Sequence, residues 1–128
     1  MIIDVHHHWM PKEHYDSLEK FMRPGRGEYV TRDASGAHLW RNGLHLHGPK
    51  PIFYEMERQL ADMDEVGVDM AVMMFGAWQE WLTAETAPFT NERAAELMAK
   101  YPKRLAAMAH PPIPIQSKAS LRELERAV

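Results

Sequence analysis

Residues 1–11 read "MIIDVHHHWMP", an apolar, β-prone run that leads directly into three consecutive histidines. The isoleucines and valine of its first half favour a short buried strand over residues 1–6, and the proline at its end breaks regular pairing. Side chains i and i+2 of a strand point to the same face, so His6 and His8 project together and His7 points away. Two imidazoles at this spacing can converge on one divalent ion.

The position of the histidines bears on their role. Active sites of α/β sheets and barrels form at the carboxyl ends of the strands, and His6 and His8 stand where the first strand is expected to end. Ordinary strand-end or loop histidines are the competing interpretation, because a bare His-x-His is a weak motif. An expression tag does not normally follow "MIID" and usually has more histidines. The residues alone leave a metal site and ordinary histidines open.

The composition excludes several classes of protein. The 128 residues suffice for one ordinary domain, and 45% hydrophobic with 26% charged residues is typical of a globular protein. A net charge of −3 without basic runs argues against a nucleic-acid partner, and no apolar run is long enough to predict a membrane span. Cysteine is absent, so any metal must be bound by His, Asp or Glu. We expect a cytoplasmic protein, since no signal peptide is recognisable.

The remainder of the chain alternates helical and strand-like patterns. Apolar residues spaced by three and four predict helices over 12–22 and 52–67, the second ended by Gly67. Residues 23–51 are interpreted as an insertion, in which "EYVTRD" and "AHLWRN" form an antiparallel hairpin. The further predictions are strands at 71–75 and 104–110, a helix over 92–101 capped by Asn91, and a helix over 117–127 capped by Ser117 or Ser120.

The order of these elements decides the fold class. Strands that alternate with helices predict right-handed βαβ units and a parallel sheet, and therefore an α/β protein. Only three core strands are predicted, and a three-stranded parallel sheet leaves an open edge. We therefore expect the 128 residues to be the front portion of something larger, apparently truncated, or a fragment completed by other chains.

Three stretches resemble one enzyme family. "IDVHHHWMP" (3–11) is similar to the first-strand signature Ile-Asp-x-His-x-His-x-x-Pro of the metal-dependent amidohydrolase superfamily, in its amidohydrolase-2 or aminocarboxymuconate-semialdehyde decarboxylase-like branch. "ERQLADMDEVGVDMAVM" (57–73) resembles the helix and second strand of that branch. "NERAAELMAKYPKRLAAMAHPPI" (91–113) is similar to its Asn-initiated helix, Tyr-Pro-x-Arg turn and third strand. The stretches occur in the family's order across nearly the whole chain.

The resemblance implies a fold and a metal site. The fold would be a (β/α)8 TIM barrel, of which residues 1–128 form the N-terminal part of a single domain and supply the first three βα units. Residues 23–51 would be its hairpin insertion. His6 and His8 would be two ligands of a divalent metal, usually zinc, with manganese as the other candidate. The family's remaining ligands, a His and a late Asp, and its acid–base His fall beyond Val128, so the catalytic residue is unknown.

Four residues are candidates for contact with a substrate. His110 follows the third strand, where a structural role is equally compatible, and Trp9 either walls the pocket or packs in the core. Trp78 either lines the barrel mouth or buries its ring. His45 lies about where the family's decarboxylase has a carboxylate-binding arginine, a departure that argues against that enzyme's own substrate. His45 and His47 are otherwise solvated loop histidines or a second metal pair.

The functional hypothesis is a metal-dependent amidohydrolase-like enzyme, a decarboxylase or hydrolase of a small carboxylic acid. Neither nucleic acid nor membrane is expected as a partner. An alternative from another class is a noncatalytic, barrel-derived fragment that folds by association, because exposed sheet edges promote homo-oligomers. A third is a protein that holds a metal on surface histidines without catalysis.

Overall fold

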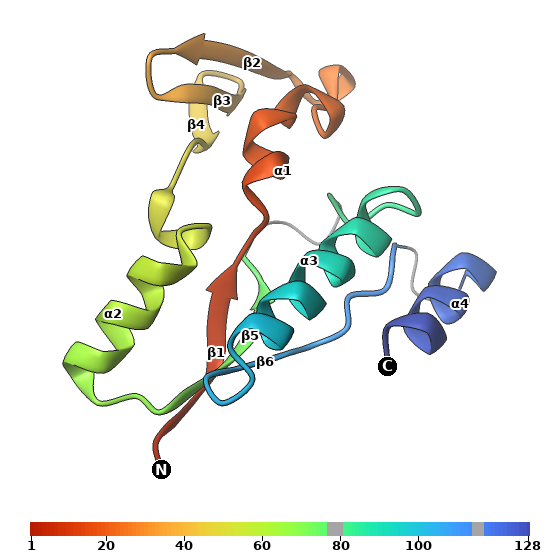
Figure 1. Ribbon diagram of the computed structural model, residues 1–128. Coiled ribbons are helices and arrows are strands. Elements are labelled where there is room, and N and C mark those ends of the chain that lie inside the picture. Colours follow the sequence, from red (N-terminus) through yellow and green to blue (C-terminus); the bar gives the residue numbers. More distant parts are fainter. Residues whose placement is uncertain (77–80, 114–116) are drawn as a thin grey trace.

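Two three-stranded sheets organise the chain in the computed structural model, which describes residues 1–76, 81–113 and 117–128 (Figure 1). One sheet is parallel with the order β1-β5-β6, and the other is antiparallel with the order β2-β3-β4. The α/β class and the parallel sheet are thus confirmed. The strands are β1 (Ile3–Trp9), β2 (Glu28–Asp33), β3 (Gly36–Arg41), β4 (Leu44–His47), β5 (Met70–Phe75) and β6 (Leu105–Ala107).

The two long helices pack on the same face of the parallel sheet. Helix α2 (Met56–Val66) precedes β5, and α3 (Thr86–Lys100) connects β5 to β6. One buried cluster joins both helices to the sheet, and its members are Trp9, Met56, Met63, Ala71, Met73, Ala94 and Leu105. The other helices are α1 (Lys12–Asp16) and α4 (Lys118–Ala127), with short 3-10 turns at Leu18–Lys20, Pro24–Arg26 and Pro51–Phe53. None of the described helices is long and apolar enough to cross a membrane.

The opposite face of the parallel sheet is less covered. Along β5, Ala71, Met73 and Phe75 are buried, whereas the intervening residues stay partly exposed. On β1, the large apolar side chains of Ile3 and Val5 are exposed. Within the described residues, this sheet is therefore dry on its helix side and open on the other.

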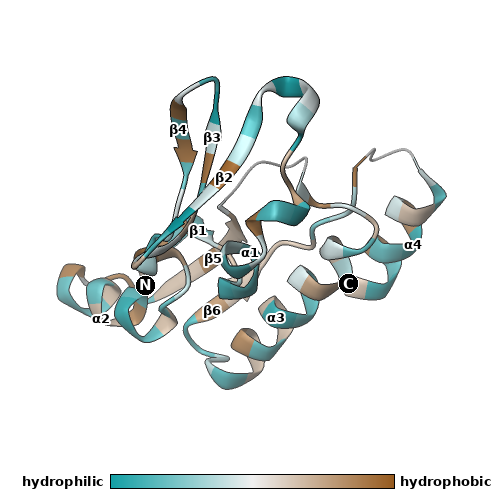
Figure 2. Cartoon of the chain, turned by 90° about the horizontal axis from the view of Figure 1, so that it is seen from above, coloured by the Kyte–Doolittle hydropathy of each residue, from teal (hydrophilic) through white to brown (hydrophobic). Residues whose placement is uncertain are grey.

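The antiparallel sheet is built around tight turns, and it forms a separate group of strands beside the parallel sheet (Figure 2). Asn42 and Gly43 have positive φ angles of 49° and 81°, as the reversal between β3 and β4 requires. Leu39 and Ala37 of β3 are buried in a cluster with Tyr15 and Leu18. The sequence predicted two strands in this segment, and the structure adds β4 as a third.

The helix ends are partly as predicted. Gly67 ends α2 with a left-handed φ of 76°, and the Ser117 hydroxyl caps α4 by accepting the N–H of Ser120 at 3.1 Å. The cap predicted at Asn91 is wrong, because α3 begins at Thr86 and Asn91 is buried inside it. The helix predicted over 12–22 is also shorter, since α1 ends at Asp16.

Candidate metal centre

His6 and His8 bring two ring nitrogens together on the open side of β1. Their Nε2 atoms are 2.9 Å apart, and both side chains are exposed. Two nitrogens that each lie about 2.0–2.1 Å from one ion, at an angle between octahedral and tetrahedral, are about 2.8–3.4 Å apart. The pair is therefore spaced as two ligands of a single ion, and the strand geometry expected from the sequence is present.

His7 points away from this pair, as expected. Its Nδ1 lies 2.9 Å from Oδ2 of Asp4, whose other oxygen accepts the backbone N–H of His6 at 3.0 Å. These contacts, the His6 backbone N–H first, lower the pKa of the Asp4 carboxyl. Asp4 thus fixes the backbone beside His6 and the ring of His7, and it makes these contacts without binding either imidazole of the pair.

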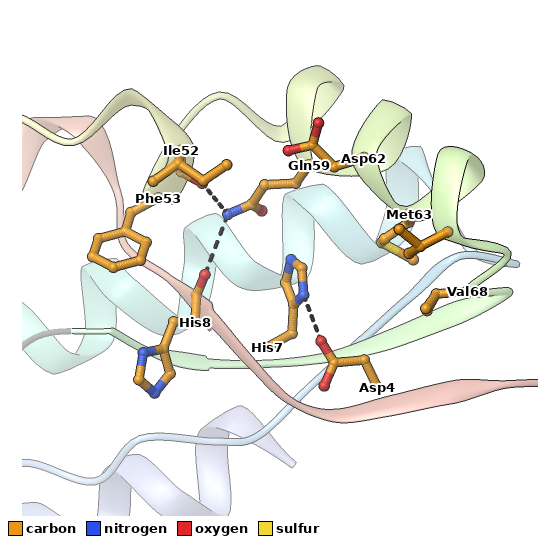
Figure 3. Close-up of a pocket in the computed structure, with 10 residues that line it drawn as sticks. Asp4, His7, His8, Ile52, Phe53, Gln59, Asp62, Met63 and Val68 are labelled. Atoms are coloured by element: carbon orange, nitrogen blue, oxygen red, sulfur yellow. Dashed lines mark hydrogen bonds and ion pairs between the residues drawn. The ribbon is translucent and has the colours of Figure 1, made fainter.

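A cavity of about 340 Å³ separates β1 from α2 (Figure 3). Figure 3 shows the ring of His7 pointing towards Gln59 of α2, while the ring of His8 lies on the other side of the strand. His7 Nε2 and Gln59 Oε1 are buried without a hydrogen-bond partner among the described residues. The cavity borders His8 as well as His7, and the His8 ring points to the other side of the strand.

Long-range contacts hold His8 in place. The Gln59 amide donates to the carbonyl oxygen of His8 at 3.2 Å, and the ring of Phe53 lies edge-on to the His8 ring at 6.2 Å. At Gly76, just after β5, an added Cβ would lie 3.2 Å from the His8 Cβ. None of these three residues was predicted from the sequence, although Gln59 was recognisable as a polar residue on the apolar stripe of a helix.

No third side chain joins the pair within the described part of the chain. Among these residues, no group of three or more His, Cys, Asp or Glu side chains is assembled in a way that could hold a metal ion. The described residues therefore supply two candidate ligands and leave other coordination positions open.

His110 is buried and tied to the end of β5. Its Nε2 accepts the backbone N–H of Phe75 at 3.1 Å, so the ring proton resides on Nδ1. Asn91 receives the His110 N–H at 2.8 Å and donates to the His110 carbonyl at 3.1 Å. Burial lowers the pKa of His110 and keeps it neutral. These contacts are structural, and contact with a substrate stays a prediction.

Of the two tryptophans predicted near the site, Trp9 lies within the described residues and Trp78 does not. Trp9 is 3% exposed and packs between the parallel sheet and the helices, with Met56 and Met63 among its cluster. This is the core packing that the sequence left as the alternative. Trp78 lies outside the described residues, so its predicted position at the barrel mouth stays a prediction.

His45 and His47 have different surroundings, because a bulge interrupts the β3–β4 pairing between Leu39 and Trp40. His45 is exposed and contacts His38 and Trp40. His47 is buried and stacked on Tyr15 at a ring distance of 5.1 Å. Burial lowers the pKa of His47 to about 4. A substrate contact by His45 stays a prediction.

Comparisons with known proteins show which sequences and structures this chain resembles. No family model matches the chain. The 2-amino-3-carboxymuconate-6-semialdehyde decarboxylase of Caenorhabditis elegans is 28% identical over 117 residues, which cover 87% of this chain and 29% of that protein.

Solved structures share the fold. The crystal structure of an amidohydrolase II matches with a TM-score of 0.67 and 18% identity, covering 100% of this chain and 37% of the other. That of 5-carboxyvanillate decarboxylase from Sphingomonas paucimobilis matches with a TM-score of 0.60 and 21% identity, covering 98% and 38%. The chain thus spans less than two fifths of the length of these relatives. The chain is therefore similar in sequence to part of the Caenorhabditis elegans decarboxylase, and it shares its fold with part of the two solved structures.

Proposed function

We propose that this chain forms the first three βα units of a (β/α)8 barrel and contributes His6 and His8 to a catalytic metal site. The enzyme would act on a small carboxylic acid. The observation that carries this proposal is the 2.9 Å separation of the two Nε2 atoms on the open face of β1.

The barrel is supported by the layering of the parallel sheet. Sequential strands β1, β5 and β6 are neighbours in the sheet, and α2 and α3 both pack on one face. A barrel has this arrangement, with helices outside and the inner face turned to the lumen. Barrel enzymes place their catalytic groups on that inner side, at the carboxyl ends of the strands. His6 and His8 occupy such a position on β1.

The two imidazoles suit zinc, with manganese as the alternative. Neutral imidazole nitrogens are common zinc ligands, and catalytic zinc sites keep a position open for water or substrate. When bound, the ion supplies Lewis-acid polarisation of a substrate oxygen. Further ligands would come from water or from outside the described residues. Gln59 and Phe53 position His8 through the contacts described above, and Asp4 fixes the backbone at His6.

The reaction we favour is decarboxylation. Two of the similar proteins are decarboxylases by name, and their names describe unsaturated or aromatic carboxylic acids. Hydrolysis at the same kind of site is the other chemistry that a single bound divalent metal supports. We retain His45, Trp78 and His110 as predicted substrate contacts, whereas the core packing of Trp9 argues against a substrate contact there. Among these, the exposed side chain of His45 is the one best placed to meet a free ligand.

Metal analysis tests the ligand assignment. We expect zinc to co-purify with the protein, or to bind it after reconstitution, and one equivalent of it to be lost in the His6→Ala/His8→Ala double variant. His7→Ala is the matched control, because it removes the neighbouring imidazole on the other side of the strand. Undiminished zinc in the double variant, or equal loss in His7→Ala, would contradict the assignment.

Turnover is measured separately as release of carbon dioxide from aromatic and unsaturated carboxylic acids. We expect release to depend on added zinc and on His6 and His8 together. Zinc binding without turnover of any acid would support the metal site and contradict the catalytic proposal for this chain.

A noncatalytic fragment that folds by association is the second candidate. The exposed side chains of Ile3 and Val5 on β1 and the half-buried residues of β5 favour it, because an uncovered apolar sheet face promotes association. Size-exclusion chromatography with light scattering tests it. An oligomer without turnover would favour this candidate, and a monomer that turns over an acid would exclude it.

A further inference from the structure

The small antiparallel sheet carries a second pair of imidazoles. Nδ1 of His38 on β3 lies 3.1 Å from Nε2 of His45 on β4, and the ring centroids are 5.2 Å apart. This nitrogen separation falls in the same range of about 2.8–3.4 Å that two ligands of one ion require. The two strands therefore bring two possible ligands together across the sheet.

A carboxylate fixes the tautomer of His38. Oδ1 of Asp33 lies 3.2 Å from His38 Nε2, and the Ser35 hydroxyl lies 2.9 Å from the same nitrogen. Ser35 donates its own proton to Asp33 at 2.6 Å, so both oxygens act as acceptors towards Nε2. The proton of His38 then resides on Nε2, and the lone pair of Nδ1 faces His45. A carboxylate that orients a histidine in this way is a common outer partner of metal sites.

The backbone of Gly48 lies close to the two nitrogens. A Cβ built on Gly48 would lie 2.6 Å from His38 Nδ1 and 3.1 Å from His45 Nε2. Among the described residues, only these two imidazole rings supply the three heavy atoms nearest to that point. Any side chain at this position would therefore collide with the His38 ring and displace it from His45.

We propose that His38 and His45 bind a divalent transition-metal ion, with Asp33 as the positioning residue for His38 and Gly48 as the residue whose missing side chain lets the two rings lie side by side. Imidazole ligands suit copper, nickel and zinc, and the order of affinities favours Cu²⁺. Water completes the shell, since no group of three or more protein ligands is found among the described residues. The ion links β3 to β4 beside the bulge at Leu39 and Trp40, where the ladder is interrupted.

Titration with Cu²⁺ tests the site by quenching of tryptophan fluorescence. The ring of Trp40 lies 4.7 Å from that of His45, which makes it a nearby reporter. All proteins in this experiment carry His6→Ala and His8→Ala, so the outcome is independent of the function proposed above. We expect saturable quenching, and a loss of affinity of about tenfold or more in His38→Ala and in His45→Ala. Asp33→Asn weakens binding by about 10–100-fold.

Gly48→Ala is an informative variant, because it retains both histidines and displaces the His38 ring from its place beside His45. Gly25→Ala is its matched control, since a Cβ at Gly25 meets nothing within 4 Å. We expect Gly48→Ala to lose affinity for Cu²⁺ and Gly25→Ala to retain it. Circular dichroism without metal verifies that each variant is folded, and a misfolded Gly48→Ala leaves the decision to the two histidine variants. Equal affinity in His38→Ala, His45→Ala and the parent would overturn the proposal.

Discussion

The two sheets each bring a pair of imidazole nitrogens within about 3 Å, but they support the pairs differently. In the parallel sheet, His6 and His8 belong to one strand, and His8 is contacted by distant residues, Gln59 and Phe53. In the small sheet, His38 and His45 come from neighbouring strands, and their partners Asp33 and Gly48 lie within a few residues. The first pair depends on the packing of the whole fold, and the second on one local arrangement of turns.

The two histidine pairs also differ in the packing of the sheets that carry them. The parallel sheet has a dry face against α2 and α3 and an uncovered face that carries His6 and His8. The small sheet buries Leu39 and Ala37 in a cluster with α1. Similar ligand spacing can therefore come from strand periodicity or from cross-strand pairing.

The largest effect is expected from breaking the core of the parallel sheet. Met73 is fully buried on β5, so Met73→Ala should reduce the free energy of unfolding by about 2–5 kcal/mol. Urea unfolding measures this, with Met108→Ala as the matched control. Met108 is 45% exposed, and its truncation should stay within about 0.5 kcal/mol. A similar cost for both variants would show that the burial of Met73 on β5 does not determine its contribution to stability.

The contact between α1 and α3 should respond to pH. His14 is buried among phenylalanine rings with its Nε2 2.9 Å from the Thr90 hydroxyl, and burial lowers its pKa to about 4. The unfolded chain binds a proton at His14 below about pH 6.5 and the folded chain does not. Its contribution to stability is therefore complete above about pH 6.5 and is lost as the pH falls towards about 4. The loss is on the order of 3 kcal/mol.

His14→Phe should flatten this part of the pH dependence, measured by urea unfolding at a series of pH values. Burial lowers the pKa of His47 and of His110 in the same direction, so these two histidines contribute to the remaining slope. An unchanged slope in His14→Phe would exclude His14 as a source of the acid sensitivity.

Breaking a buried ion pair in the insertion should cost more stability than breaking an exposed ion pair. Glu28 is 6% exposed, and it accepts the Arg23 N–H at 2.7 Å and the Arg41 Nε–H at 3.0 Å. Glu28→Gln should cost about 1–3 kcal/mol. The exposed pair of Glu19 with Arg32 is the control, and Glu19→Gln should cost less than about 1 kcal/mol. Thermal unfolding measures the stability of both variants. Equal losses of stability would contradict the expected difference between the buried and the exposed pair.

The smallest effect on stability is expected at two turn glycines, one beside the parallel sheet and one in the small sheet. Gly67 after α2 and Gly43 between β3 and β4 both have left-handed φ angles, 76° and 81°, with open space where a Cβ would lie. Alanine at either position should therefore cost about 1 kcal/mol through the backbone alone. Thermal unfolding of the two variants should give similar shifts. A much larger cost at one glycine would reveal a constraint beyond its dihedral angle.

Much of the fold was predictable because its signals are local. The apolar run at 71–75, the helix ended by Gly67 and the Asn42-Gly43 turn each carry their structure in neighbouring residues. The start of α3 was not predictable in this way, because Asn91 looks like a cap. Its side chain instead binds the backbone of His110, 19 residues away.

The local part of the candidate site was also predictable, and its long-range contacts were not. His6 and His8 follow from the period of two in a strand, whereas Gln59 reaches His8 across 51 residues and leaves no local signal of that contact. The pairing of His38 with His45 depends on the register of β3 and β4, and the bulge in that register is not written in the composition of either strand. Long-range contacts and strand register are thus what the sequence pattern lacked.

Crystallographic anomalous scattering at the zinc absorption edge is the sharpest test of whether His6 and His8 share one ion. The protein is crystallised with zinc, and the His7→Ala variant serves as a control for the strand. We expect a single peak about 2.0–2.1 Å from Nε2 of both His6 and His8. A folded, zinc-soaked protein whose two imidazoles share no anomalous peak would contradict the shared site.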